Sequence, residues 1–311
     1  MSIKREGLVY KSTGSWYKVR MEDDSFLDCR VRGKLKLAKV KTTNPVAVGD
    51  NVIVTNDAQH KGTGIIGEIL PRSNFVIRKS VHKTEHGHLL AANIDPAMLM
   101  ISISYPKTSF GFIDRFLVST DAYRIPTVMI INKTDLHTVE DDALMEQIIL
   151  TYEHIGIKCY PISVKANEGL QIFDTLLNNK LSLLAGHSGT GKSSLMNCLH
   201  PVIQQKIGEV SVFANKGIHT TTFAEMFELP DGSRVIDTPG INELGLIDIG
   251  DHELSDYFPE MRLLLGKCKF NNCSHSHEPA CAVIAAVEAG KIAPSRYYSY
   301  LSMLENDDTR R

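Results

Sequence analysis

Apolar and polar positions alternate over short stretches in the first 70 residues of the 311-residue chain. About five such stretches, rich in valine, isoleucine and aromatic residues, are separated by turn residues such as Gly14 and Gly49. They are Gly7–Tyr10, Trp16–Arg20, Ser25–Val31, Asn51–Thr55 and Ile65–Leu70. Short strands at this density predict a small all-β barrel of the OB type. An SH3-like barrel has a similar pattern, and the sequence leaves that alternative open.

From about residue 89 the pattern changes to buried strands that alternate with helices. Two apolar runs, Met98–Ser104 and Pro126–Asn132, are typical of strands buried on both faces, whereas Phe112–Arg124 and Glu140–Ile155 have helical spacing. Strand and helix continue to alternate at Lys158–Ile162, Gly169–Leu177 and Leu181–Ala185. This alternation predicts an α/β domain with a mostly parallel sheet.

The formal net charge of −2 conceals a division of charge along the chain. Residues 1–88 contain 16 Lys and Arg against 9 Asp and Glu, a net of +7, whereas the remaining 223 residues contain 18 against 27, a net of −9. Because side chains alternate in an extended segment, four cations fall on one face: Arg30, Arg32, Lys34 and Lys36. That face is suited to following a phosphate backbone, so we expect it to bind RNA.

The sequence has neither a membrane span nor a secretory signal. No apolar run reaches the roughly 18 to 20 residues that a span needs, and the N-terminus lacks an apolar core. We therefore expect a cytoplasmic protein with no membrane partner. Six cysteines are too few and too scattered for a disulfide framework. Three of them cluster within residues 268–281, which favours a metal site in a reducing compartment.

A phosphate-binding loop follows the strand predicted at Leu181–Ala185. The segment Gly186-His-Ser-Gly-Thr-Gly-Lys-Ser193 matches the pattern GxxxxGK[ST] and precedes a helical stretch. Glycines let the backbone wrap around an anion, and successive N–H groups bind the β-phosphate. We expect Lys192 to reach the β- and γ-phosphates and Ser193 to ligate Mg²⁺. The predicted contacts are Gly186, His187, Ser188, Gly189, Thr190, Gly191, Lys192, Ser193 and Ser194.

A second loop, Asn132-Lys-Thr-Asp135, indicates which base is bound. It stands at the end of a β-branched strand. The Asp135 carboxylate can accept hydrogen bonds from N1 and the 2-amino group of guanine, and adenine does not offer these donors in that arrangement. We expect Asn132 to contact the O6 and N7 side of guanine and the Lys133 stem to pack on the ring.

A third loop, Ser163-Val-Lys165, follows another strand and resembles the SAK-type loop whose backbone contacts the guanine carbonyl. The predicted guanine contacts are therefore Asn132, Lys133, Thr134, Asp135, Ser163, Val164 and Lys165. They predict GTP and GDP as ligands and argue against an ATP-using enzyme or kinase.

Two further elements would complete a magnesium site. Asp237-Thr-Pro-Gly240 follows a short strand, so Asp237 would hold Mg²⁺ through water and the Gly240 N–H would sense the γ-phosphate. Between this motif and the phosphate loop lie three consecutive threonines. One of them should complete the Mg²⁺ shell in the GTP state. We prefer Thr221, with Thr220 and Thr222 as alternatives.

The order of the motifs is permuted. An ordinary P-loop GTPase presents the phosphate loop, the switch threonine, DxxG, NKxD and then SAK. Here the loops at 132 and 163 come before those at 186, 220–222 and 237. All of them lie at one edge of one sheet, so a chain cut and rejoined elsewhere assembles the same pocket. The γ-phosphate sensor then leads into the C-terminal domain, and we expect nucleotide state to be coupled to that domain.

Three cysteines and a histidine near the C-terminus have the spacing of zinc ligands. They are Cys268, Cys273, His275 and Cys281. Three thiolates and one imidazole make a closed tetrahedral set, which is typical of a structural Zn²⁺ and leaves no open position for catalysis. His277 is the alternative imidazole.

Permuted GTPase motifs, a basic N-terminal barrel and a C-terminal Cys-x4-Cys-x-His-x5-Cys site together resemble the RsgA/YjeQ family of bacterial GTPases that depend on the small ribosomal subunit. The resemblance covers essentially the whole chain. It implies an OB-fold barrel at 1–71, a circularly permuted α/β GTPase domain at 72–245 and a small, mainly helical zinc domain at 246–311. It further implies weak intrinsic GTP hydrolysis stimulated by the small subunit, rRNA as a partner, and a role in late assembly. We expect a monomer.

The predicted catalytic residues are Lys192, Thr221 and Gly240, but the sequence does not identify the group that positions the attacking water. Ras-like enzymes carry a glutamine directly after DxxG, and this chain has Ile241. His219 is one substitute, and a ribosomal group supplied in trans is the alternative. The missing glutamine also supports a second hypothesis: a GTP-gated rRNA-binding module that leaves RNA by nucleotide exchange, without hydrolysis.

Overall fold

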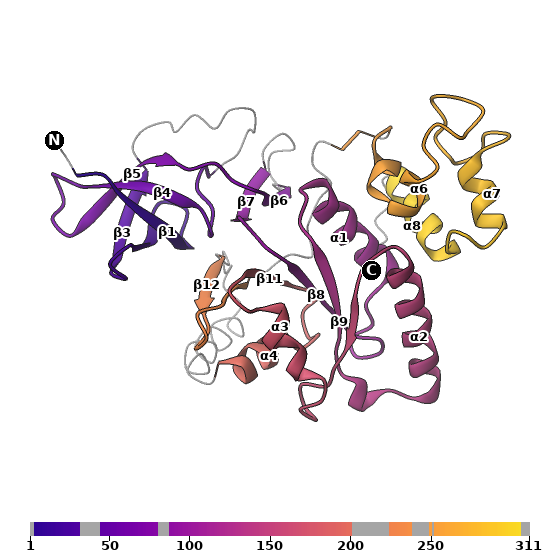
Figure 1. Ribbon diagram of the computed structural model, residues 1–311, viewed down its shortest axis with the longest axis horizontal. Coiled ribbons are helices and arrows are strands. Elements are labelled where there is room, and N and C mark those ends of the chain that lie inside the picture. Colours follow the sequence, from indigo (N-terminus) through magenta and orange to yellow (C-terminus); the bar gives the residue numbers. More distant parts are fainter. Residues whose placement is uncertain are drawn as a thin grey trace, which may run out of the picture.

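The computed structural model describes residues 3–31, 44–79, 87–200, 224–237, 249–250 and 252–305. Figure 1 shows three units in chain order: a β-barrel, a central sheet with helices on both faces, and a small helical unit. Within the described residues, no helix is long and apolar enough to cross a membrane.

The N-terminal unit is a closed five-stranded barrel made of β1 (Arg5–Ser12), β2 (Tyr17–Met21), β3 (Phe26–Val31), β4 (Asn51–Asn56) and β5 (Thr63–Ile69). Its strand order is β1-β2-β3-β5-β4, and β4 pairs with β1 to close the ring. The β3–β5 pairing is parallel and the others are antiparallel. This Greek-key order is that of an OB fold, which excludes the SH3-like alternative.

The central unit is a six-stranded sheet in the order β10-β9-β8-β11-β13-β12. The strands are β8 (Ala97–Ile101), β9 (Thr127–Ile131), β10 (Cys159–Pro161), β11 (Leu181–Ala185), β12 (Glu225–Glu228) and β13 (Arg234–Asp237). All pairings are parallel except that of β12 with β13. The strands that precede β11 in the chain fill one half of the sheet and those that follow it fill the other. The permuted order of the motifs is therefore also visible in the strand order.

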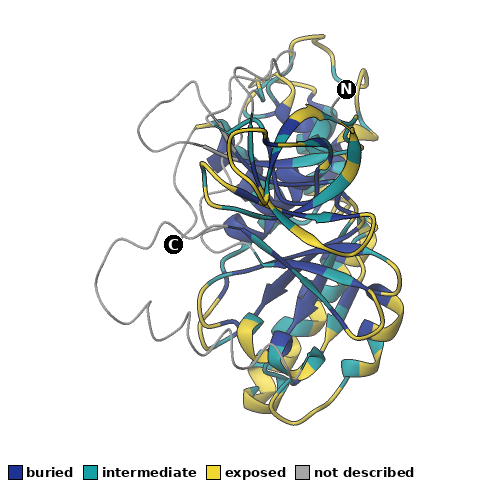
Figure 2. Ribbon diagram, turned by 90° about the vertical axis from the view of Figure 1, so that its left-hand side faces the viewer, coloured by how far each residue is buried: buried dark blue, intermediate teal, exposed yellow. Residues whose placement is uncertain are grey.

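Alternating side chains of these strands serve two separate cores. Leu99, Ile101 and Leu183 pack with α1 (Phe110–Ala122) and α2 (Val139–His154). Met98, Met100 and Leu184 pack on the other face with α3 (Phe173–Leu176) and α4 (Lys192–Leu199). Because both faces are covered, the central strands β8, β9 and β11 are almost entirely apolar, as the runs in the sequence predict. Figure 2 shows these buried strands enclosed by helices with exposed outer surfaces.

A hairpin joins the barrel to the sheet. It consists of β6 (Phe75–Lys79) and β7 (Gly87–Ala92), which pair antiparallel. The sequence pattern did not predict this hairpin, in which Val76, Leu90 and Ala91 are buried in the same core as α1. Short apolar triplets on either side of a charged turn are a weak strand signal, and tertiary packing decides the outcome.

The C-terminal unit contains a 3₁₀ turn η5 (Leu254–Tyr257) and the helices α6 (Pro259–Arg262), α7 (Ala282–Glu288) and α8 (Pro294–Leu304). It packs on α1 through Arg296, which is 1% exposed. The Arg296 guanidinium donates to Glu260 of α6 at 2.8 Å and to Asp114 of α1 at 2.6 Å. Tyr152 of α2 also donates to Asp114, at 2.7 Å. A buried cation between two carboxylates fixes the helical unit to the central sheet.

Candidate GTP-binding site and metal centre

The predicted phosphate loop lies between β11 and the N-terminus of α4, at the carboxyl edge of the sheet. Gly186, Gly189 and Gly191 have positive φ angles of 144°, 83° and 107°. A Cβ on Gly191 would come within 2.3 Å of the Asn132 Nδ2 atom, and one on Gly186 within 2.2 Å of the Met100 carbonyl oxygen. Glycine is therefore required at both positions, for its conformation and for the close approach of neighbouring strands.

Lys192 of this loop interacts electrostatically with Asp237 at the end of β13. The Lys192 Nζ donates to the Gly186 and His187 carbonyl oxygens, each at 2.7 Å, so the ammonium is folded over the loop. Burial lowers the pKa of Lys192, and the nearby Asp237 carboxylate opposes that shift. Burial raises the pKa of Asp237, and Lys192 opposes that shift in turn. This pairing brings one cation and one carboxylate to the phosphate end of the pocket.

Asn132 ties three loops together. Its side chain, 2% exposed, donates from Nδ2 to the Thr190 carbonyl oxygen of the phosphate loop at 2.8 Å. Its Oδ1 accepts from the Val164 N–H at 3.1 Å. The sequence suggested a role for Asn132 against guanine; the structure adds that both ends of its amide hold the neighbouring loops in place.

Asp135 is oriented by the third predicted loop. The Ser163 hydroxyl donates to Asp135 Oδ1 at 2.6 Å and accepts from the Ala166 N–H at 3.0 Å. The Asp135 side chain is 17% exposed, and its Oδ2 lies 4.0 Å from the Lys165 Nζ. Ser163 is fully buried. The carboxylate is thus held in one orientation by the SAK-type loop.

A loop without a sequence motif lies beside the base-reading loop and the phosphate loop. Residues 102–109 follow β8, and the Tyr105 carbonyl oxygen accepts from the Lys133 Nζ at 2.5 Å. Pro106 lies within 3.4 Å of the position that a Cβ on Gly189 would occupy. The loop therefore touches both the base-reading loop and the phosphate loop. Its position after a buried strand, at the same sheet edge, was the only signal for it in the sequence.

Several predicted residues lie outside the described ranges. They are the switch residues His219, Thr220, Thr221 and Thr222, the γ-phosphate sensor Gly240, and the cations Arg32, Lys34 and Lys36. Of the predicted magnesium ligands, Ser193 and Asp237 are described, and Ser193 is exposed at the start of α4.

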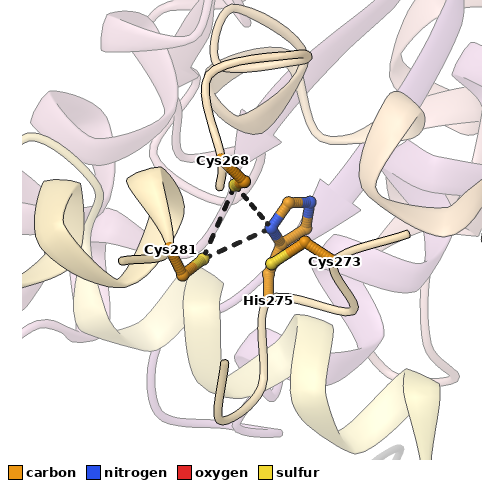
Figure 3. Close-up of side chains that lie close together, drawn as sticks. All are labelled: Cys268, Cys273, His275 and Cys281. Carbon is orange, nitrogen blue, oxygen red and sulfur yellow. Dashed lines mark hydrogen bonds between the residues drawn. The ribbon is translucent and has the colours of Figure 1, made fainter. Parts of the chain in front are cut away.

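The four predicted zinc ligands come together in the C-terminal unit, as Figure 3 shows. Their ligand atoms all lie within 4.8 Å of one another. The Sγ atoms of Cys268 and Cys281 are 3.9 Å apart, and the His275 Nδ1 lies 3.5 and 3.4 Å from them. Ligands at tetrahedral corners around zinc would be separated by about 3.8 Å for two sulfurs and about 3.5 Å for nitrogen and sulfur. The cluster therefore fits one Zn²⁺.

The histidine alternative is resolved in favour of His275. His277 is exposed and its Nδ1 contacts the Ser276 hydroxyl at 2.8 Å. His275 is buried with a φ of 57°, and Glu278 holds its loop by accepting from the N–H groups of Ser274, Ser276 and His277. Burial raises the pKa of the Cys273 thiol to about 12, and zinc keeps such thiols deprotonated when it binds.

An aromatic residue that the sequence analysis did not single out lies beside the predicted RNA-binding cation Arg30. The Arg30 guanidinium stands 4.9 Å from the ring centre of Trp16, which is 38% exposed. Arg30 also donates to Asp57 Oδ2 at 2.9 Å and contacts the His60 ring at 2.9 Å. Trp16 ends the β1–β2 loop, and Asp57 and His60 belong to the β4–β5 loop. An arginine–tryptophan stack therefore lies on the barrel where these two loops meet.

The strand order of the sheet and the loops at its carboxyl edge define a circularly permuted P-loop GTPase. The chain belongs to the RsgA GTPase family: the family model "RsgA GTPase" matches residues 69–247, and "RsgA N-terminal domain" matches residues 6–66. It is accordingly a GTP hydrolase.

Relatives match along nearly the full length. Small ribosomal subunit biogenesis GTPase RsgA of Cytophaga hutchinsonii is 49% identical over 98% of this chain and 100% of its own. RsgA 2 of Bacteroides thetaiotaomicron is 45% identical over 97% of each chain. Among solved structures, YjeQ from Thermotoga maritima aligns with a TM-score of 0.75 at 32% identity, covering 99% of this chain and 100% of that one. YloQ, described as a circularly permuted GTPase, aligns at 0.71 and 29% identity, covering 99% and 96%.

Proposed function

We propose that this GTPase binds the small ribosomal subunit, acts in its late assembly in the cytoplasm, and is released when the subunit stimulates GTP hydrolysis. The observation that carries the proposal is the pocket in which Asn132 joins the base-reading loop, the SAK-type loop and the phosphate loop. The names of relatives that match along the whole chain supply the ribosomal partner.

Each part of the pocket has a role in this proposal. Asp135, held by Ser163, reads guanine, while the phosphate-loop amides and Lys192 stabilise the charge that develops on the phosphates during hydrolysis. Ser193 and Asp237 would hold Mg²⁺, together with Thr221 of the undescribed switch segment. The ion neutralises charge between the β- and γ-phosphates when it is bound.

Purified small subunits are expected to raise GTP turnover at least about 100-fold, because groups supplied in trans stimulate P-loop GTPases by such factors or more. Phosphate release under multiple turnover, with and without subunits, measures the effect, and large subunits serve as the control. Turnover that subunits leave unchanged would contradict the proposal.

Single-turnover hydrolysis at saturating GTP tests the second hypothesis, because a GTP-gated binding module would bind subunits without cleaving its nucleotide.

Trp16 is expected to stack on an unpaired base when the barrel binds RNA. In OB folds the β2–β3 face and the loops beside it bind single strands, and stacking on an aromatic contributes about 1–3 kcal/mol per base. Trp16 is the only tryptophan of the chain, so quenching of intrinsic fluorescence by a single-stranded oligonucleotide reports this contact directly. Trp16→Ala should weaken binding about 5- to 150-fold, as that stacking energy implies, and Trp16→Phe should weaken it much less.

A duplex of the same length is the matched ligand for this experiment. It offers the same phosphates but no free base faces, so it should bind through the cations without quenching Trp16. Equal quenching by duplex and single strand, or unchanged affinity of Trp16→Ala for the single strand, would show that the stack is structural only.

A further inference from the structure

The barrel and the GTPase sheet are one continuous sheet. β1 of the barrel pairs antiparallel with β12, so the strand order runs without a break through 11 strands. Figure 1 shows β12 lying between the barrel and the remaining strands of the central sheet. The residues aligned across this junction are Lys11 and Glu225.

This junction lies in register with the nucleotide pocket. Glu225 is aligned with Asp237 on β13, and Asp237 is aligned with Leu184 on β11, two residues before Gly186. A single row of paired residues therefore runs from the barrel to the strand that carries the phosphate loop. The row includes Asp237, the carboxylate that interacts with Lys192. Strand pairing of this kind connects each strand of the row physically to the next, which is the sort of contiguous network along which coupling can travel.

Polar side chains reinforce the junction on both sides of the strand pairing. The Lys11 Nζ lies 2.9 Å from Glu225 Oε2. Glu228 accepts from the Tyr10 hydroxyl at 2.8 Å and from the Arg20 guanidinium. Arg20 also donates to the Tyr10 hydroxyl, at 2.8 Å. Each charged side chain is between 25% and 38% exposed, so these ion pairs contribute little to stability. What they specify is the position of β12 against the barrel.

A bulge in β1 brings Tyr10 to this junction. The β1–β2 register shifts between Val9 and Lys11, and the Tyr10 side chain, 6% exposed, packs in the core of the GTPase domain with Ala224 and Met226. A bulge redirects a side chain that would otherwise follow the alternation of its strand. The barrel thus places its own residue Tyr10 beside β12, the strand whose Glu225 is aligned with Asp237.

We propose that β12 couples RNA binding by the barrel to the magnesium-binding side of the GTP site. Arg20 and Glu228 are the positioning residues of this coupling. In this arrangement a barrel seated on RNA fixes β12, which fixes β13 and the Asp237 carboxylate for hydrolysis. The proposal rests on the proposed function in that RNA on the small subunit is what seats the barrel. Its structural core, the coupling of β1 to β12, does not depend on that partner.

The first experiment needs no ribosomal subunit. Amide hydrogen exchange is measured for the GDP form and for the form with a non-hydrolysable GTP analogue, in the wild type and in Glu228→Gln. In the wild type, exchange in β1 and β12 should differ between the two nucleotides. In Glu228→Gln the ratio of β1 exchange rates between the two nucleotide forms should be at least about fivefold smaller than in the wild type. The corresponding ratio for β12 should persist. A β1 difference that is absent in the wild type, or identical in the variant, overturns the proposal.

The second experiment measures turnover on small subunits. Glu228→Gln should lower the subunit-stimulated kcat about tenfold, leaving basal turnover and the subunit concentration for half-stimulation unchanged. Asp24→Asn is the matched control, because Asp24 also binds Arg20, at 2.8 Å, but lies within the barrel. It should have no effect. The pair Arg20→Glu and Glu228→Arg should each lose stimulation, and the double variant should recover most of it.

Purely adhesive contacts would give a different pattern. They predict equal effects of Glu228→Gln and Asp24→Asn, or a loss of subunit affinity with an unchanged stimulated kcat. They also predict no recovery in the double variant. Each of these results overturns the proposal. Thermal unfolding of every variant shows whether it is folded. If subunits fail to stimulate even the wild type, the proposed function fails, and the exchange experiment still decides on the β1–β12 coupling.

Discussion

Removal of zinc, or replacement of Cys281 by alanine, is expected to unfold the C-terminal unit. Its core is small, and Cys281 lies at the centre of it, 3% exposed, where its Sγ accepts from the Ile284 N–H at the start of α7. Structural zinc contributes about 10–16 kcal/mol of apparent binding free energy in zinc-finger peptides, as much as the total stability of a typical domain. Without it no disulfide links the three cysteines, and the loop from 268 to 281 is left to hydrogen bonds such as those of Glu278.

Limited trypsin digestion measures this unfolding at one residue. Arg296 is 1% exposed and becomes a cleavage site only when α8 detaches from α1. We expect rapid cleavage at Arg296 and loss of far-ultraviolet helical signal after chelation, with metal analysis confirming that zinc has left. Cys198→Ala is the matched control, because Cys198 is exposed on α4, outside the cluster. If Arg296 stays protected in zinc-free protein, the metal is dispensable for the fold and the prediction is wrong.

The sequence could predict that the three loops meet, because each loop depends on local chemistry. Gly186 and Gly191 have backbone conformations and close neighbours that only glycine tolerates. The glycines of the sequence motif are therefore the residues that the loop geometry requires. The zinc cluster is predictable for a similar reason, since four ligand types at tight spacing have few other uses. β8 and β11 are buried at every position because both faces of the sheet are covered, and apart from Ser182 all their residues are apolar.

The contacts between domains were not predictable in the same way. Tyr10 meets Glu228 across 218 positions of sequence, and Arg296 meets Asp114 across 182. Nothing local in either segment marks its partner. Trp16 was read as part of a strand because the aromatic and β-branched residues of Trp16–Arg20 are typical of ordinary strands. Its stack with Arg30 depends on the register of β2 against β3, which the folded barrel fixes.

The two units that flank the GTPase domain contact it at different elements. The sequence suggested that the permutation couples the γ-phosphate sensor to the C-terminal unit, and the segment that would do so, residues 238–248, lies outside the described ranges. In the described residues β12, at the edge of the central sheet, pairs with a strand from the N-terminal barrel. The two flanking units thus contact the GTPase domain at different elements, the barrel at β12 and the zinc unit at α1.

Asp135→Asn is expected to switch the nucleotide preference of the site from guanine nucleotides to xanthosine nucleotides. The wild-type carboxylate accepts from both guanine donors, whereas an asparagine would present an amide N–H₂ to one of them. Sites built to hydrogen-bond a particular group reject the mismatched ligand by about 10⁴-fold, and we expect a loss of that order for GTP. Xanthine carries a 2-oxo group that accepts from the new amide, so XTP should bind about as tightly as GTP binds the wild type. Displacement of a fluorescent nucleotide by each competitor measures both affinities.

Ser163 makes this prediction sharper. Its hydroxyl donates to Asp135 Oδ1 at 2.6 Å, and in the variant it would keep the oxygen of the amide on its own side and leave the N–H₂ facing the base. Adding Ser163→Ala to Asp135→Asn should therefore remove much of the gain for XTP, because the amide is then free to rotate. Asp142→Asn, an exposed carboxylate that contacts His137 at 3.1 Å, is the control and should leave GTP selectivity intact. Unaltered guanine selectivity in Asp135→Asn would mean that another residue reads the base.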